Sequence, residues 1–404
     1  MVPGAVALAA AMTVAAAAMF QTQRTPNVDS AGNILSAVAA LASNDVWAVG
    51  FSGNSTGFNQ AKTLTEHFNG TSWSVMSSPN PNPNGCANPS FALTAVAPAS
   101  HSDVWAVGYR NSDQTCTTLF QPIIFHWNGS AWSDTANPLL SPAGNNALNG
   151  VVSLASNNVY AVGYQSGPLE AVQTLVEHWD GVSWSVVPSP NANSTGNVLN
   201  GVSAVNPSDI WAVGDQVAPN VPVLTLTEHW NGSAWSVAPS PNPVTGSDLD
   251  QNVLNAVVSL APNDVTAVGF TLDFNAQRVL TLIEHWNGTS WSVVPSPNPS
   301  TASGALNKLT SVAALSPSNI YAFGFFANSS TGGQTLSLAL HYDGVSWNTI
   351  SAPTPARAQQ LFGAAALSST RELWSVGGSA IHGIDFETGT LQLPKTLAIF
   401  TATP

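Results

Sequence analysis

The sequence predicts an all-β protein, a seven-bladed β-propeller of four-stranded antiparallel blades, and three observations lead to that prediction. A short apolar run ending in glycine recurs seven times at nearly even spacing along the chain. A second run, in which Asn-Gly or Asp-Gly separates two apolar stretches, occurs six times. The 404-residue chain is 44% apolar but only 7% charged, which suits a packed repeat protein and not a disordered chain.

The glycine-terminated run is the first anchor of each repeat and reads as a buried β-strand. The Asn-Gly or Asp-Gly pair of the second anchor predicts a two-residue hairpin turn in which both residues have positive φ. The first anchor occurs at Val46–Gly50, Val104–Gly108, Val159–Gly163, Ile210–Gly214, Val265–Gly269, Ile320–Gly324 and Leu373–Gly377. The second occurs at Glu66–Trp73, Phe125–Trp132, Glu177–Trp184, Glu228–Trp235, Glu284–Trp291 and Leu340–Trp347.

Each repeat predicts four strands, which we name A to D in chain order. In the fifth repeat they are Val253–Leu260, Val265–Gly269, Thr281–Trp286 and Ser290–Pro297. Four strands in about 50 residues, repeated seven times, match the blades of a propeller. The proline-rich end of strand D suits an outer edge, where a missing N–H group is harmless.

The two ends of the sequence predict how the ring closes. The seventh repeat has a strand A at Leu361–Leu367 and a strand C at Thr396–Phe400, but no strand D. The segment Phe20–Asn27 aligns with Trp291–Asn298, which places Phe20 where the other blades have tryptophan. We expect this N-terminal strand to complete blade 7, so that residues 20–404 form a single propeller domain.

Residues 1–19 are interpreted as a signal peptide or an apolar N-terminal segment. The run Ala5–Phe20 is short for a membrane span, and Ala15–Ala18 would suit a signal-peptidase site, although no Lys or Arg precedes the run. We expect a secreted protein, or a cell-surface one if the segment stays uncleaved. Because Phe20 begins the closing strand, cleavage is expected at or before Met19.

The order of these elements resembles the kelch and galactose-oxidase type of propeller repeat. Strand B ends in glycine, strand C ends in an aromatic residue, and strand D starts with tryptophan, as in that family. Kelch repeats usually end strand B with two glycines, and here only the last blade does, at Gly377 and Gly378. The resemblance covers nearly the whole chain and implies the architecture without implying an activity.

The spacings also separate the two faces of the disc. The A–B and C–D turns have constant length, whereas the distance from the strand-B glycine to the strand-C histidine varies between blades and is longest in blade 7, counted to Ile399. The D–A connections vary as well. Because antiparallel strands alternate in direction, the B–C and D–A loops emerge on one face, and we expect that face to be the functional one.

Composition excludes some partners. A net charge of −13 with eight Lys and Arg argues against nucleic-acid binding and against docking on an anionic membrane. We expect a monomer whose partner is a protein or a glycan. The only two cysteines, Cys86 and Cys116, fall in variable-face loops of blade 2, so a disulfide is expected, with two free thiols as the alternative.

The recurrent polar residues are interpreted as structural. The strand-C histidines lie too far from the axis to converge on a metal ion, so each is expected to make one repeated hydrogen bond. The Asp or Asn before strand B is expected to bond backbone N–H groups in the tight A–B turn. The histidines are His67, His126, His178, His229, His285 and His341. Four of them follow a glutamate, Glu66, Glu177, Glu228 or Glu284, for which we expect the same structural role.

Polar residues outside the repeat pattern are the candidate ligand-binding residues. They fall in loops of the variable face and are Asp248, Asp250, Asp273, His382, Asp385 and Glu387. No nucleophile elbow, HExxH motif or phosphate-binding loop is present, and no catalytic residue, cofactor or metal is assigned. The sequence thus favours an extracellular, non-catalytic binding module. The alternatives are a glycan-binding or glycan-active propeller, and an enzyme with a metal-assisted site in the blade 7 loop.

Overall fold

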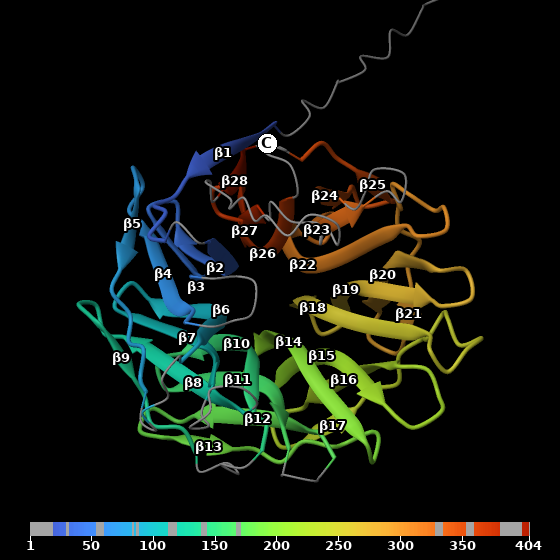
Figure 1. The fold of residues 1–404 in the computed structure, drawn as a ribbon, viewed down its shortest axis with the longest axis horizontal. Helices are drawn as coiled ribbons and strands as arrows, with labels where there is room; N and C mark the ends of the chain where they lie inside the picture. The colour runs from blue at the N-terminus through green and yellow to red at the C-terminus, as the bar shows by residue number, and fades with distance from the viewer. Residues whose placement is uncertain are drawn as a thin grey trace, which may run out of the picture.

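Seven four-stranded blades surround a central axis in the computed structural model (Figure 1). The structure describes residues 19–29, 32–53, 60–82, 85, 89–111, 119–138, 144–166, 171–327, 334–352, 359–379 and 398–403. Blades 5 and 6 are joined into one eight-stranded sheet by a single parallel pair, Val279 with Leu306. In the described part of the chain, no helix has the length and hydrophobicity that crossing a membrane requires.

Each blade runs from an inner strand A to an outer strand D. The A strands are β2 (Asn33–Ala42), β6 (Phe91–Ser100), β10 (Ala147–Ala155), β14 (Gly196–Asn206), β18 (Gln251–Ala261), β22 (Leu306–Ser316) and β26 (Gln359–Leu367). The B strands are β3 (Asp45–Ser52), β7 (Asp103–Asn111), β11 (Asn158–Gln165), β15 (Asp209–Val217), β19 (Asp264–Asp273), β23 (Asn319–Ala327) and β27 (Glu372–Ser379).

The outer half of each blade is shorter. The C strands are β4 (Lys62–Phe68), β8 (Phe120–Trp127), β12 (Gln173–Trp179), β16 (Leu224–Trp230), β20 (Arg278–Trp286), β24 (Thr335–Tyr342) and β28 (Ala398–Thr403). The D strands are β5 (Trp73–Met76), β9 (Trp132–Asp134), β13 (Trp184–Val186), β17 (Trp235–Val237), β21 (Trp291–Val293) and β25 (Trp347–Thr349).

The predicted closure of blade 7 is confirmed, because the N-terminal strand β1 (Met19–Arg24) lies in its outer position. It pairs antiparallel with β28 in the sheet order β1-β28-β27-β26. Phe20 is opposite Ala402, which is opposite Leu373, so Phe20 does occupy the tryptophan position. The predicted strand C is displaced by two positions, because Thr401, and not Ile399, stands at the histidine position opposite Trp374.

The strand-B glycine is required by a close approach between strands. Strand A has a β-bulge just beyond this point, for example between Leu35 and Ala37. A Cβ atom on Gly50 would lie 2.0 Å from the carbonyl oxygen of Ile34, and the equivalent glycines are equally crowded. Any other residue would force the two strands apart.

The hairpin turn between strands C and D differs from the prediction. Phe68 pairs with Trp73, so the loop has four residues, and in it only Gly70 has positive φ. The side chain of Asn69 accepts hydrogen bonds from the backbone N–H groups of Thr71 and Ser72. The asparagine therefore stabilises the turn through its amide oxygen and does not need the left-handed conformation.

The apolar core lies between blades and not within them. Each cluster combines one face of a blade with the facing side of the next, as where Trp47 and Val49 of blade 1 pack with Leu93, Val104 and other residues of blade 2. Near the axis, side chains of strand A also donate hydrogen bonds to strand A of the next blade. These bonds join Thr94 to Leu148, Asn149 to Leu199, Asn200 to Leu254, Asn255 to Leu309 and Thr310 to Leu361, at 2.6–3.0 Å.

Deleting residues 1–25 should destabilise the ring, because it removes β1 and exposes the edge of β28. The indole N–H of Trp73 in blade 1 would also lose Gln23, to which it donates at 3.3 Å. We expect a loss of roughly 2–5 kcal/mol in the free energy of unfolding, measured by urea denaturation. Deleting only residues 1–18 is the control, and equal stability of the two deletion variants would contradict this role of β1.

Candidate functional site

A hydrogen bond between histidine and Asp or Asn recurs in six blades. The strand-C histidine Nε2 lies 2.8–2.9 Å from an oxygen of the residue that begins strand B. In blades 3 and 6 that oxygen belongs to the amides of Asn158 and Asn319, which can only accept, so the histidine donates from Nε2. The structural role predicted for the histidines is therefore confirmed, whereas the Asp and Asn side chains bond the histidines and not, as predicted, the turn backbone.

The histidine rings also stack on the strand-B ring of their own blade. Centroid distances are 4.2–4.5 Å in the five blades that have both the histidine and a Trp or Tyr at that position. Burial lowers the pKa of His178 and His341, although Asp180 and Asp343 oppose the shift. These two histidines are thus neutral at pH 7, which suits a structural bond to an amide oxygen.

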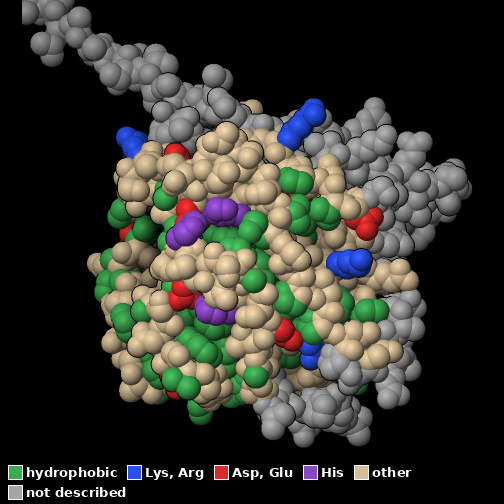
Figure 2. Space-filling model, turned by 90° about the vertical axis from the view of Figure 1, so that its left-hand side faces the viewer, with side chains coloured by type: hydrophobic (Ala, Val, Ile, Leu, Met, Phe, Trp, Pro, Cys, Tyr) green, Lys and Arg blue, Asp and Glu red, His purple; other side chains and the backbone are tan. Residues whose placement is uncertain are grey.

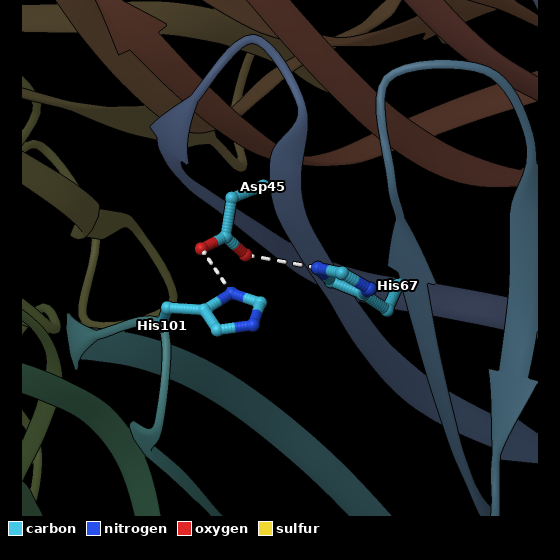
Figure 3. Close-up of side chains that lie close together, drawn as sticks. All are labelled: Asp45, His67 and His101. Atoms are coloured by element: carbon cyan, nitrogen blue, oxygen red, sulfur yellow. Dashed lines mark hydrogen bonds and ion pairs between the residues drawn. The ribbon is translucent and has the colours of Figure 1, made fainter. Parts of the chain in front are cut away.

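At Asp45 of blade 1, a histidine from blade 2 joins this pattern (Figure 3). Asp45 accepts from His67 through one oxygen and from His101 Nδ1 through the other, both at 2.9 Å. Within the described residues it is the one cluster of three potential metal-ligating side chains. His101 is 75% exposed, and Asp45 already serves as the repeat acceptor, so the three groups satisfy one another without an ion.

His101 is not part of the repeat pattern and was not among the predicted site residues. It lies in the A–B turn of blade 2, where the aligned turns of blades 1 and 3 to 6 have serine or proline, and that departure was its only signal. The side of the ring that Figure 2 shows has histidine and acidic side chains next to each other, in a surface otherwise mostly uncharged.

Four glutamates are buried between blades. Glu66, Glu177, Glu228 and Glu284 are fully buried, and each faces the preceding blade from the middle of strand C. Burial raises the pKa of each carboxyl to about 8. Blades 2 and 6 have Phe125 and Leu340 at this position, both inside the apolar clusters. The site is therefore an apolar one in which glutamate is held in its neutral form.

These glutamates should make the protein less stable as the pH rises from 4.5 to 8. Below pH 4.5 the carboxyl is protonated in both states, and between the two pKa values the unfolded chain releases the proton first. The free energy of unfolding should fall by about 1.4 kcal/mol per pH unit and per glutamate, and remain constant above pH 8.

The substitution Glu228→Gln should therefore stabilise the protein by a few kcal/mol at pH 7.5 and hardly at all at pH 4.5, in urea unfolding at both values. Asp180→Asn at an exposed C–D turn is the matched control, because four other blades have asparagine there, and it should leave the slope above pH 5 unchanged. An equal effect of Glu228→Gln at both pH values would show that the buried carboxyl is ionised.

Three of the predicted ligand-binding residues lie within the described part of the chain, next to one another on the variable face of blade 5. Asp250 is buried and accepts from the backbone N–H groups of Ser247 and Phe274 at 2.8 and 2.9 Å. Asp273 accepts from the Ala276 N–H and lies 3.5 Å from Arg278. Asp248 is exposed. Two of the three carboxylates thus organise their own loops, and their role in ligand binding stays a prediction.

The remaining predicted residues lie outside the described part of the chain. They are Cys86, Cys116, His382, Asp385 and Glu387. The disulfide between the two cysteines and the ligand site in the blade 7 loop therefore stay predictions.

A group of aromatic side chains was missed by the sequence analysis. The residue after the strand-B glycine is aromatic in five blades, and each such side chain is half-buried. We call Phe51, Tyr109, Tyr164, Phe270 and Phe325 the axial aromatic group. Each pairs with the first half of strand A, as Phe51 does with Ile34, so the group lies at the end of strand B from which the B–C and D–A loops leave.

A charged pair interrupts the axial aromatic group. Blade 4 has Asp215 at this position, and Lys308 of blade 6 places its ammonium 4.2 Å from the ring centroid of Phe270. Burial raises the pKa of Asp215, and a hydrogen bond from Asn200 and the charge of Lys308 oppose the rise. Burial likewise lowers the pKa of Lys308. The rings and one pair of opposite charges thus lie on the same face of the disc, the face from which the B–C and D–A loops leave.

Comparison with known proteins places the fold. No family model and no curated protein sequence matches the chain. The solved structures "YCF48 from Cyanidioschyzon merolae" and "Crystal structure of RRP9 WD40 repeats" both align with a TM-score of 0.53. Their identities are 11% and 10%, over 96% and 95% of this chain and 98% and 100% of theirs.

A third solved structure, "YCF48 bound to D1 peptide", aligns with a TM-score of 0.50 and 12% identity over 95% of this chain and 94% of that one. At these identities the likeness shows the β-propeller repeat fold alone. The finer resemblance to kelch repeats stays a prediction.

Proposed function

We propose that this chain is a non-catalytic binding module, and that it holds a peptide segment of a partner protein on the face formed by the B–C and D–A loops. The observation that carries the proposal is the axial aromatic group. Five half-buried rings from five blades lie at the ends of the B strands, on the face that bears the variable loops. Aromatic side chains supply a large contact area at low entropic cost, which is why they dominate protein-binding hot spots.

The fold also supports a peptide ligand. A propeller of the same architecture, YCF48, has been solved with the D1 peptide bound. Asp215 and Lys308 offer one charge of each sign beside the rings, which suits the mixed polar groups of a peptide. A glycan remains the alternative ligand, because sugars also pack on aromatic rings.

We further propose that the module has a kelch-type repeat and works outside the cell. The basis for the location is the apolar run Ala5–Phe20 together with the low content of charged residues. Expression with residues 1–19 should release the propeller into the medium. Retention of the whole chain in the cytoplasm would contradict the location without affecting the binding proposal.

Selection from a displayed peptide library tests the binding function. Peptides that bind the full chain should bind at least tenfold more weakly to the double variant Tyr109→Ser/Tyr164→Ser, because one buried aromatic anchor is worth about 2 kcal/mol. The control is Val182→Ser/Val345→Ser, which changes two side chains that are 84% and 88% exposed at C–D turns of the opposite face.

Isothermal titration of the selected peptides measures both variants, and thermal denaturation checks that they are folded. Equal affinity of the Tyr109→Ser/Tyr164→Ser variant would overturn the site. A library without binders, combined with saturable binding on a glycan array, would establish the glycan alternative instead.

A further inference from the structure

An aromatic side chain at the third position of strand B fills the space between the outer strands of two neighbouring blades. In blade 4, Trp211 is 1% exposed and stacks on His229 at 4.4 Å. On its other side it meets Trp286 and Trp291 of blade 5, at centroid distances of 4.9 and 5.2 Å. The third residue of strand B is aromatic in six blades and is Trp47, Trp105, Tyr160, Trp211, Tyr321 or Trp374.

Blade 5 alone departs from this rule, because it has Thr266 at the aromatic position. The surrounding groups are nevertheless those of the other blades. His285 lies on the same blade, and Tyr342 and Trp347 of blade 6 form an aromatic pair at 5.6 Å. The side chains that surround the strand-B ring in the other blades, which we call the frame, are therefore present in blade 5, but they surround the short side chain of Thr266.

A cavity of about 510 Å³ results between blades 5 and 6. Its walls include Thr266, Ile283 and His285 from blade 5, and Ile320, Tyr342 and Trp347 from blade 6. This volume lies within the range of small-molecule sites, roughly 300–1,000 Å³. Because residues of two A–B turns, Asn263 and Pro317, also line the cavity, it is on the face opposite the axial aromatic group.

The rim of the cavity has a polar group suited to an indole. In blade 1 the indole N–H of Trp47 donates to Asp45 at 3.0 Å, while the same carboxylate accepts from His67. Asp264 is the equivalent residue of blade 5, accepts from His285 at 2.9 Å and also lines the cavity. The indole N–H groups of Trp105 and Trp211 make no such bond in blades 2 and 4. A ring that entered at Thr266 would thus find stacking partners on both sides, and Asp264 in the position of the acceptor that blade 1 uses.

We propose that the cavity between blades 5 and 6 binds an indole ring, supplied by a tryptophan side chain of a partner polypeptide. The blades themselves show the chemistry of the fit, since the same frame holds an indole of this chain in blades 1, 2 and 4. This site goes beyond the proposed peptide-binding face, lies on the other side of the disc, and does not rest on it.

Titration of the full-length protein with 5-fluoroindole, observed by fluorine NMR, tests the site directly. We expect saturable binding to the wild type, competed by N-acetyl-tryptophanamide and by short tryptophan peptides, but not by N-acetyl-leucinamide. If a partner polypeptide supplies the indole, a tryptophan within a short peptide should bind more tightly than free indole. Tighter binding of free indole than of every tryptophan peptide would overturn the polypeptide source.

Two substitutions that restore the ring provide the decisive variants. Thr266→Trp and Thr266→Tyr reproduce the residues of the other blades, should fill the cavity, and should weaken binding of the probe at least tenfold with an unchanged or higher Tm. The control Thr266→Val keeps the cavity and should retain binding. If Thr266→Trp is too large to fold, Thr266→Tyr carries the comparison.

The outcomes separate cleanly. Absence of saturable binding to the wild type, equal competition by the leucine compound, or undiminished binding to both ring-restoring variants would each overturn the indole site. None of these results bears on the Tyr109→Ser/Tyr164→Ser variant, which changes only the opposite face. The two proposals can therefore fail independently.

Discussion

The contact on which the rest of this structure depends is the packing of one blade's strand-B side chain against the strand C and D aromatics of the next blade. No blade has a core of its own among the described residues, since every apolar cluster there is shared between two neighbours. Stability in such an array is approximately a sum over repeats and interfaces. A substitution at one strand-B ring therefore changes mainly the packing between two neighbouring blades. Blade 5 differs from the other blades at this strand-B position.

Neutral hydrogen bonds take the place that ion pairs have in most soluble proteins. The hydrogen bonds between A strands of neighbouring blades are made by Asn and Thr side chains. In blades 1, 3, 4 and 5, a Thr at the start of strand C also forms hydrogen bonds with a Ser-Pro-Asn segment after strand D. Even the buried glutamates are held uncharged. Because charged groups are few, added salt should screen little of the energy that holds the ring together.

Much of the fold follows from the repeat, because each anchor fixes both the identity and the register of a strand. The exceptions occur where an anchor is missing. Blade 7 has neither the histidine nor the tryptophan of strand C, so the sequence alone did not determine the register of this strand. Ile399 was assigned to the histidine position, which Thr401 occupies two residues further along. The turn at Asn69 was misassigned because Asn-Gly dipeptides occur in more than one hairpin geometry, and only the observed pairing of Phe68 with Trp73 distinguishes them.

The candidate sites were harder to predict, since they arise between blades. Thr266 is visible in the sequence as a departure, but the cavity beside it also needs Tyr342 and Trp347, which belong to the next repeat along the chain. The axial aromatic group was overlooked for a similar reason, as its members share no loop. By contrast, Asp250 looked like a free loop carboxylate, and its burial depends on backbone N–H groups from two loops.

The pairing of β1 with β28 has a consequence for how the protein is made. Arg24 and its partner Ala398 come from opposite ends of the sequence, so the first strand to leave the ribosome must wait for the last. Six blades can assemble in order during synthesis, and the entropic cost of the final closure grows only slowly with the length of the intervening chain. Only a polypeptide that extends through β28 can therefore close the ring, because a chain that ends before β28 lacks the strand with which β1 pairs.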